Sequence, residues 1–261
     1  DFFNNKDNFL NTFYNKYNSY EMELNNIEDV TFITYSKYGL IEIKNSSLDQ
    51  SLEIVRRRID EVGTKEPTIV KRGSDRILIE LPGLDDPNRI KNLLGKTANL
   101  SFRLVAENDE DFGSETLFFE DNTTTLKVNK RIALSGDNLV NAKPSLNNTT
   151  NETIVSFTLN RVGAKKFGRI TTKNVGKKLA IILDNKIISA PTIQEPILGG
   201  NGQISGNFTF QSATDLALLL RSGALPAPLN IIEERTVGPD LGEDSIKAGS
   251  ISLAIGFLLV I

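Results

Sequence analysis

The sequence predicts an α+β fold built from two modules, and three observations support this. Apolar residues recur at helical spacing in some segments, most clearly between residues 47 and 63. Elsewhere they alternate with polar residues over short runs, as at 98–104, which is typical of half-buried strands. The composition changes at residue 107, where a polar, acidic stretch begins. We therefore expect one α+β module before this point and a second one after it.

The first sixty residues predict a helix, a hairpin and a second helix. Residues 1–26 are expected to form an N-terminal helical segment, because aromatic side chains recur there at helical spacing: Phe2, Phe9, Phe13 and Tyr17. Residues 30–35 and 38–44 predict the two strands of a hairpin. The second helix begins after Ser47, a capping residue, and ends at Gly63.

The next elements complete the first module. Residues 68–71 and 77–81 are short β-branched runs, and Asp86 with Pro87 opens a short helix that ends at Gly95. A strand follows at 98–104. The order from residue 40 to 105 is thus β-α-β-β-α-β, which predicts a ferredoxin-like module with helices on one face of an antiparallel sheet.

The second module has its own strands and helix. We expect strands at 127–134 and 153–159, a helix at 161–172, and a hairpin of 179–183 with 186–190 that turns at Asp184-Asn185. The helix at 212–223 and the strand at 229–233 resemble elements of the first module. The middle module is therefore expected to be an insertion.

The C-terminal run from Ala248 to Ile261 carries no charge. At a rise of about 1.5 Å per residue it spans about 21 Å, against about 30 Å for the hydrocarbon core of a bilayer. The run ends without a capping residue, which favours a truncated transmembrane helix in contact with lipid; the alternative is a buried core helix. The acidic flank before it weakly favours the non-cytoplasmic side.

The composition excludes several classes of chemistry. The chain has 30 basic and 33 acidic residues and neither His nor Cys. It therefore has no Ser-His-Asp triad, no cysteine nucleophile, no zinc finger and no haem or iron-sulfur ligation. No acidic pair stands out as catalytic by its spacing. With a net charge of −3 and no basic stripe recognised, we expect no nucleic-acid partner.

Three motifs resemble ligand sites without meeting their requirements. Gly95-Lys96-Thr97 matches the end of a phosphate-binding loop, but it follows a helix and opens a strand. The glycines at 199–202 and 206 lack the strand and helix of a dinucleotide site, so a flexible turn is expected. The acidic residues at 109–120 lack the glycine of a calcium loop. We therefore predict no catalytic, cofactor-binding or metal-binding residues.

Four segments of the sequence resemble the SecD subunit of the bacterial protein-translocation machinery. They lie at 55–83, 95–105, 163–193 and 218–249, and include the runs GKTANLSFRLV and GKKLAIILDNKIISAPTI. The resemblance implies the first periplasmic domain and the start of the second transmembrane helix. It also implies a ferredoxin-like base with an inserted head that swings relative to it. Such a subunit is not an enzyme; it acts with SecF beside the SecYEG channel on unfolded preproteins, driven by proton flow across the bacterial inner membrane.

With this resemblance the expected domains are a variable helical segment (1–26), the base (27–106 and 210–237), the inserted head (107–209), and a linker with the truncated membrane helix (238–261). The expected head–base hinge consists of four residues: Glu107, Asn108, Gly206 and Asn207. Candidates for preprotein contact are Ile187, Ile188 and Ile193, although ordinary core strands are an alternative interpretation of the same residues. An alternative function is the porter domain of a related proton-driven small-molecule exporter.

Overall fold

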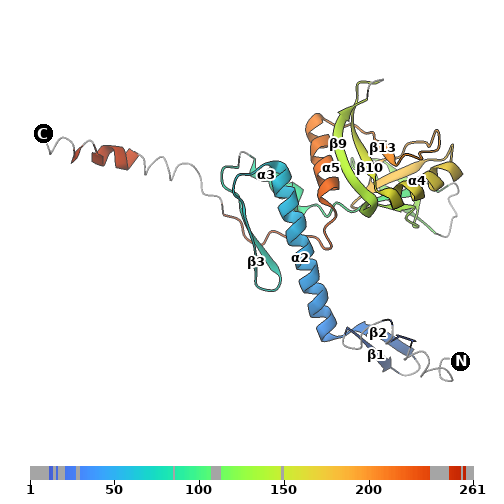
Figure 1. Cartoon of the computed structure of the whole chain (residues 1–261), viewed down its shortest axis with the longest axis horizontal. Helices are drawn as coiled ribbons and strands as arrows, with labels where there is room; N and C mark the ends of the chain where they lie inside the picture. Colours follow the sequence, from blue (N-terminus) through green and yellow to red (C-terminus); the bar gives the residue numbers. More distant parts are fainter. Residues whose placement is uncertain are drawn as a thin grey trace. The chain divides into compact units, whose positions relative to one another are not determined.

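The computed structural model describes residues 12–13, 16, 21–27, 30–84, 86–106, 113–147, 150–235, 247–253 and 255–256 (Figure 1). The chain divides into two compact units, Asp1–Leu229 and Asn230–Ile261. Residues 247–253 of the second unit are helical, and the strand predicted at 229–233 is not formed. Among the residues described, no helix has both the length and the apolar character needed to cross a bilayer. The predicted membrane segment extends to residues 257–261, which lie outside this set.

The first unit opens with an antiparallel hairpin and a long helix. Strand β1 (Met22–Ile27) pairs with β2 (Val30–Tyr35), and α2 (Lys37–Val62) follows. Three predictions are therefore wrong: residues 22–26 are not helical, residues 38–44 are helical rather than a strand, and Ser47 lies inside α2 and does not cap its start. Ser36 explains the second difference, because its hydroxyl accepts a hydrogen bond from the Gly39 amide at 3.0 Å and begins the helix. The rest of the predicted helix at 1–26 lies mostly outside the described residues.

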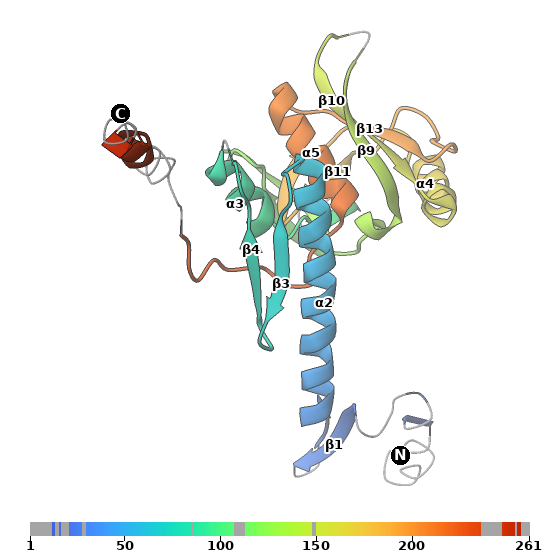
Figure 2. The same cartoon turned by 60° about the vertical axis from the view of Figure 1, so that its left-hand side comes forward.

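The second half of α2 packs against a hairpin and a short helix, as predicted. Gly63 ends α2 in the left-handed conformation, with φ of 82°. Strands β3 (Thr68–Arg72) and β4 (Arg76–Glu80) form the hairpin, and α3 (Pro87–Gly95) is capped by Asp86. Figure 2 shows the hairpin alongside α2. The shared core consists of Val55, Ile59 and Ile69, with further half-buried apolar side chains around them.

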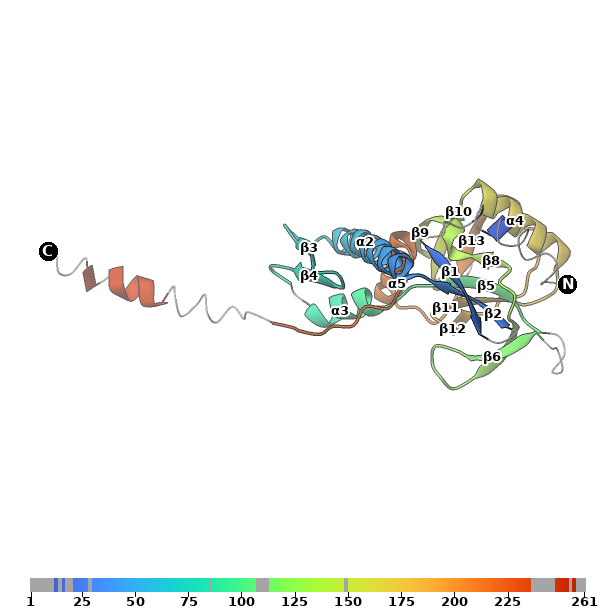
Figure 3. The same cartoon turned by 90° about the horizontal axis from the view of Figure 1, so that it is seen from below.

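The four-stranded sheet expected for a ferredoxin-like base is not formed. Among the described residues, β3 and β4 pair only with each other, because the predicted first strand at 38–44 is helical. Strand β5 (Leu100–Leu104) joins a different sheet, of order β12-β11-β5-β8 (Figure 3). Its other members are β8 (Leu134–Ser135), β11 (Leu179–Leu183) and β12 (Lys186–Ser189). The α+β class is confirmed, but the strands predicted for one base sheet are divided between the β3–β4 hairpin and the sheet that contains β5.

The turn between β11 and β12 forms as predicted. Asp184 and Asn185 have φ of 49° and 63°. Positive values at both central residues are typical of a tight hairpin turn, which Asn and Asp tolerate. Strand β11 pairs antiparallel with β5, with Ile181 opposite Phe102. This hairpin also forms one wall of a surface groove.

A second sheet and two helices complete the first unit. Strands β9 (Leu139–Leu146), β10 (Thr153–Leu159) and β13 (Asn201–Ile204) form a sheet of order β13-β10-β9. Strand β9 lies at an edge, where Pro144 is tolerated because no neighbour needs its missing amide hydrogen. The remaining elements are β6 (Ser114–Phe118), β7 (Thr125–Asn129), the 3-10 turn η2 (Gly136–Asn138), α4 (Arg161–Lys173) and α5 (Phe210–Ser222).

The two sheets and α4 share an aromatic core. Phe102 of β5, Phe157 of β10 and Phe167 of α4 lie with ring centroids 5.5 to 6.2 Å apart. Gly202 permits this packing, because a Cβ there would lie 2.4 Å from the Phe157 ring. The glycine-rich stretch predicted to be a flexible turn is thus partly a strand, β13.

Helix α5 joins the same core. Its buried residues include Ala213, Leu216 and Leu220, and the helix contacts β9, β10 and α2. We expected α5 to belong to the base, but most of its packing is against the sheet of β9 and β10. The structure thus associates α5 with the predicted head as well as with α2.

Candidate functional site: a groove between α3, α5 and the β11–β12 hairpin

A groove of about 850 Å³ opens where α3, α5, the β11–β12 hairpin and the end of β6 meet. Its apolar side chains come from α3, α5, the β11–β12 hairpin, the turn after β6 and the segment before α5: Leu93, Phe119, Leu183, Ile187, Ile188, Phe208, Leu216 and Leu219. Most of these are buried core residues; Phe119, Ile188 and Phe208 are half-buried and provide the accessible part of this surface. The groove can therefore accept apolar groups.

The rim of the groove is polar and carries both signs of charge. Its polar and charged residues are Asp86, Asn88, Arg89, Asn92, Lys96, Glu120, Asp121, Asn207, Gln211, Ser212 and Asp215. The hydroxyl of Thr123 donates a hydrogen bond to Asp121 at 2.6 Å, and this lowers the pKa of that carboxyl. Acidic residues outnumber basic ones at this rim.

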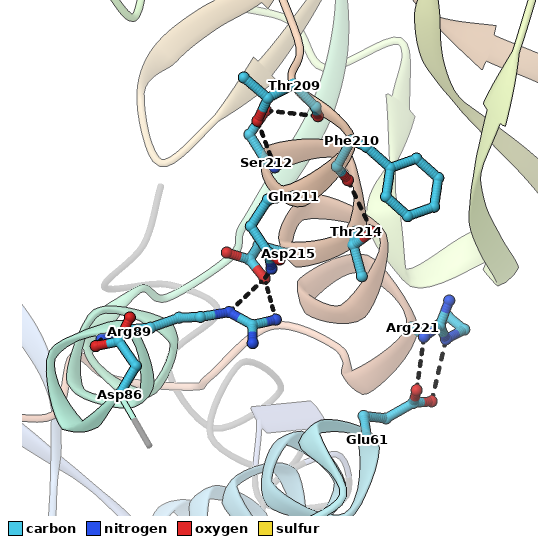
Figure 4. A network of polar contacts seen from close by, with 10 residues as sticks. All are labelled: Glu61, Asp86, Arg89, Thr209, Phe210, Gln211, Ser212, Thr214, Asp215 and Arg221. Atoms are coloured by element: carbon cyan, nitrogen blue, oxygen red, sulfur yellow. Dashed lines mark hydrogen bonds and ion pairs between the residues drawn. The ribbon is translucent and has the colours of Figure 1, made fainter. Parts of the chain in front are cut away.

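An ion pair joins the two helical walls across the rim (Figure 4). Asp215 Oδ1 of α5 accepts hydrogen bonds from Arg89 Nη2 at 2.7 Å and Arg89 Nε at 3.1 Å. Gln211, one turn earlier on α5, donates to the same oxygen at 2.9 Å. Asp86 caps α3 by accepting from the Arg89 amide at 3.0 Å, which positions the start of that helix. The Arg89–Asp215 ion pair at the rim is thus supported by further hydrogen bonds from Gln211 and at the start of α3.

The hairpin wall is anchored by Asp184. Its carboxylate accepts hydrogen bonds from the amides of Ala98 at 3.0 Å and Asn99 at 2.8 Å, and from the hydroxyl of Thr97. At the other strand of the hairpin, the Glu120 amide donates to the Ile187 carbonyl at 3.1 Å. That bond occupies part of the free edge of β12. The hairpin wall is therefore held in place by these hydrogen bonds, and the outer edge of β12 is already partly paired with the residues after β6.

A second ion pair lies on the other side of α5, outside the groove. Glu61 of α2 accepts two hydrogen bonds from Arg221, at 3.0 Å from Nε and 2.6 Å from Nη2 (Figure 4). These bonds hold the pKa of the Glu61 carboxyl below its usual value, although partial burial opposes the effect. Arg221 also donates to the Ala142 carbonyl of β9. One arginine thus links α2, α5 and β9.

A buried arginine joins α2 to the C-terminal ends of α3 and α5, the two helices of the groove. The Arg58 side chain is fully buried and donates to five carbonyl oxygens, at 2.5 to 3.4 Å: those of Leu93, Leu94, Lys96, Thr97 and Gly223. These carbonyls lie around the C-terminal ends of α3 and α5, where a positive charge is favourable. Burial lowers the pKa of the guanidinium to about 10, so it stays charged at neutral pH.

The structure brings some of the predicted site residues together at the groove. Ile187 and Ile188 line it, and Gly206 and Asn207 lie on its rim. Ile187 is fully buried in strand β12, however, as the alternative interpretation as core strands expects. Ile193 is buried in the main core away from the groove, but it lies outside the strands. Glu107 and Asn108 lie outside the described residues.

The sequence did not indicate Arg89, Asp215, Phe119 or Phe208 as site residues. A spacing signal existed for one contact only, since Gln211 and Asp215 are four residues apart on a helix. Arg89 and Asp215 are separated by 126 residues, so only the fold brings them together. No group of acidic side chains in the described part of the chain is arranged to hold a metal ion.

Comparison with known proteins identifies the family. The family model for the SecDF P1 head subdomain matches residues 114–227, and the model for the N-terminal part of the P1 domain of protein translocase subunit SecDF matches residues 48–107. A solved structure, described as a membrane component SecDF that enhances protein export, is 32% identical with a TM-score of 0.63, covering 74% of this chain and 94% of that one. The chain belongs to the SecD/SecDF family. It contains the P1 domain of that family.

Individual SecD proteins are more similar in sequence. The protein translocase subunit SecD of Rickettsia bellii is 50% identical over 237 residues, and that of Acetobacter pasteurianus is 49% identical over 222. The matches cover 87% and 82% of this chain but 46% and 43% of those proteins, so the chain spans less than half of their length. SecDF in its super-membrane-facing form is 34% identical, with a TM-score of 0.64, covering 82% of this chain and 31% of that one.

The family assignment bears on two earlier expectations. The matched relatives are described as protein translocase subunits, which is the class that the sequence predicts for this chain. Both family models describe parts of SecDF, which favours the translocase over the small-molecule exporter. The head model also extends to residue 227 and therefore includes α5, in agreement with the packing of that helix on β9.

Proposed function

We propose that the chain is the P1 part of a SecD subunit that assists proton-motive-force-driven translocation of preproteins through the Sec channel. Its proposed partners are SecF, the SecYEG channel and unfolded preproteins. Its proposed location is the periplasmic side of the bacterial inner membrane, with the apolar C-terminal run in contact with lipid. The SecD relatives and the two P1 family models support this proposal.

We propose further that the groove contacts the preprotein. The observation that carries this is the combination of apolar side chains from α3, α5, the β11–β12 hairpin and two adjoining loops with a rim of hydrogen-bonding groups. An unfolded chain presents apolar side chains and unpaired backbone amides and carbonyls, and a groove of this composition offers partners for both. Among the three isoleucines named from the sequence, only Ile188 is both at the groove and partly accessible.

Head–base movement would change the groove, because its walls come from both parts. Helix α3 lies in the base segment, whereas the β11–β12 hairpin lies in the head. The Arg89–Asp215 pair joins α3 to α5 and would have to break if they separate. We propose the first hinge at Glu107 and Asn108, as the sequence suggests. We propose the second hinge either at Gly206 and Asn207, as the sequence suggests, or at Gly223, which has φ of 91°. The packing of α5 on β9 supports Gly223, because α5 would then move together with the head.

Site-specific photo-cross-linking tests the contact. A photoreactive residue is placed at Ile188 or Phe208 in the full-length subunit that carries this domain, while a stalled preprotein occupies the channel. Val140, which is 62% exposed on β9 and does not line the groove, is the matched control position. We expect preprotein adducts from 188 and 208 and none from 140. Adducts from 140 alone, or none from either groove position while export proceeds, would exclude the groove as the contact surface.

A further inference from the structure

One stretch of the head carries only positive charge. Between Glu152 and Asp184 the sequence has no acidic residue and seven basic ones: Arg161, Lys165, Lys166, Arg169, Lys173, Lys177 and Lys178. The stretch belongs to a chain whose net charge is −3, so its charge is opposite to that of the remainder. The overall balance of charge in the sequence therefore conceals this basic stripe.

Helix α4 gathers five of these residues on one face. At 100° per residue, Arg161, Lys165, Lys166, Arg169 and Lys173 fall within less than half of the helix circumference, and all five are exposed. The opposite face of the helix carries Phe167 and Thr171, which are buried. The five bases form no ion pair with any residue that the structure describes. We call these five residues the α4 basic face.

Apolar groups lie among these charges. A shallow hollow of about 420 Å³ is lined by Ala164, Gly168 and Leu198 together with Thr172 and three of the bases. The Leu198 side chain is 73% exposed beside it, and Val162, on the same arc of α4 as the bases, is 57% exposed. The surface therefore offers cations around a small apolar patch, which matches the headgroup region of a bilayer.

The charge arrangement is unfavourable for the helix itself. Arg161 and Lys165, Lys165 and Arg169, and Arg169 and Lys173 are like-charged pairs four residues apart, which destabilise a helix. Arg161 also stands at the N-terminal, positive end of the helix dipole. The acidic residues on neighbouring segments are Asp137 in η2 and Glu195 in the loop before Leu198, and neither forms an ion pair with the α4 basic face. Intramolecular stability thus does not explain these bases.

We propose that the α4 basic face docks on the anionic phospholipid headgroups of a membrane surface. Three of the five side chains are lysines, which act as point charges and suit a plane of diffuse negative charge better than a fixed set of carboxylates. The exposed Leu198 and Val162 supply the apolar component that an acidic protein segment would not require. This inference rests on α4 and its surroundings and is independent of the groove.

Vesicle binding by the 261-residue chain tests the proposal. The triple variant Lys165→Gln, Arg169→Gln, Lys173→Gln is compared with the parent on vesicles of mixed phosphatidylglycerol and phosphatidylcholine. Each basic residue near an anionic surface contributes about fivefold, so we expect the affinity to fall by about 100-fold. Pure phosphatidylcholine vesicles measure any binding through the apolar C-terminal residues, which all variants share.

A matched triple variant removes the same charge elsewhere. Lys44, Lys65 and Lys130 are exposed and form no ion pair among the described residues, and their replacement by Gln should leave the affinity unchanged. Equal losses in both triple variants would mean that net charge alone matters, and would overturn the proposal. So would an unchanged affinity of the α4 variant, or binding to a polyglutamate peptide without binding to anionic vesicles. If the triple variant fails to fold by circular dichroism, Arg169→Gln alone should lose about fivefold.

Discussion

Arg58 shows how one residue organises this domain. Its guanidinium donates hydrogen bonds to five backbone carbonyls at the ends of α3 and α5, in place of water. Among the described residues, no carboxylate forms a hydrogen bond with it. Burying a charge is costly unless its hydrogen-bonding capacity is used, and here only Nε lacks a partner. Arg58 thus fixes the relative positions of the helices that form two walls of the groove.

Replacing Arg58 by Ala should lower the free energy of unfolding by about 3 kcal/mol or more, because several buried carbonyls lose their donor. The neighbouring Arg57 is exposed, and Arg57→Ala should change the free energy by less than about 0.5 kcal/mol. Urea unfolding followed by far-ultraviolet circular dichroism measures both. Similar effects of the two substitutions would contradict the assigned role of Arg58.

At the scale of elements, two ion pairs connect the predicted base with the head. Helices α2 and α3 belong to the base, and both contact α5, which packs on the head sheet. Glu61 and Arg221 join α2 to α5, while Arg89 and Asp215 join α3 to α5. Both ion pairs are partly exposed, so each contributes modestly on its own. Together with the hydrogen bond from Arg58 to the Gly223 carbonyl, these ion pairs are contacts that must break if α5 moves away from α2 and α3.

The Glu61–Arg221 pair predicts a pH dependence of stability. The pKa of Glu61 is lower in the folded chain than its usual value of 4.5, so the folded state favours the ionised carboxylate. The resulting stabilisation is fully present above about pH 4.5 and is lost as the pH falls through the folded-state pKa. Glu61→Gln should therefore lower the unfolding free energy at neutral pH by about 0.5–1 kcal/mol, and this difference should vanish in acid.

Glu53→Gln provides the comparison for this prediction. Glu53 pairs with Arg56 on the exposed face of the same helix, with both side chains about half exposed. Its replacement should cost only about 0.3 kcal/mol. Denaturant titrations over a range of pH values measure the two variants. If the difference between the parent and Glu61→Gln does not decrease on acidification, the ion pair does not stabilise the α2–α5 contact.

The elements with local signals were predictable from sequence. Asp86 caps α3, Gly63 ends α2, and Asp184-Asn185 turns the β11–β12 hairpin, as expected. The helical start at 38–44 was missed although Ser36 caps it locally, whereas the two missed strands have non-local causes. Strand β9 was missed because it contains Pro144, which a strand tolerates only at the edge of a sheet. Strand β13 was missed because its glycine, Gly202, serves packing against Phe157.

At the scale of the whole molecule, the family was predictable from the sequence and the site was not. Four long segments of the chain suffice to indicate SecD, and the family models agree. The groove depends on contacts between residues far apart in the chain, such as Arg89 with Asp215, and no periodicity indicates these. The burial of Ile187 in β12 and of Ile193 in the main core likewise follows from tertiary packing and not from their apolar character alone.

The central claim is that the groove binds an unfolded polypeptide, and nuclear magnetic resonance titration of the 261-residue chain with an unfolded, apolar-rich peptide tests it most directly. We predict that saturable shifts of backbone amides cluster at the groove, on Arg89, Ile188, Asn207, Gln211 and Asp215. Amides of Val140 and Leu146 on the outer strand β9 should not shift, although both side chains are exposed. Shifts confined to other surfaces, or no shifts at saturating peptide, would contradict the account.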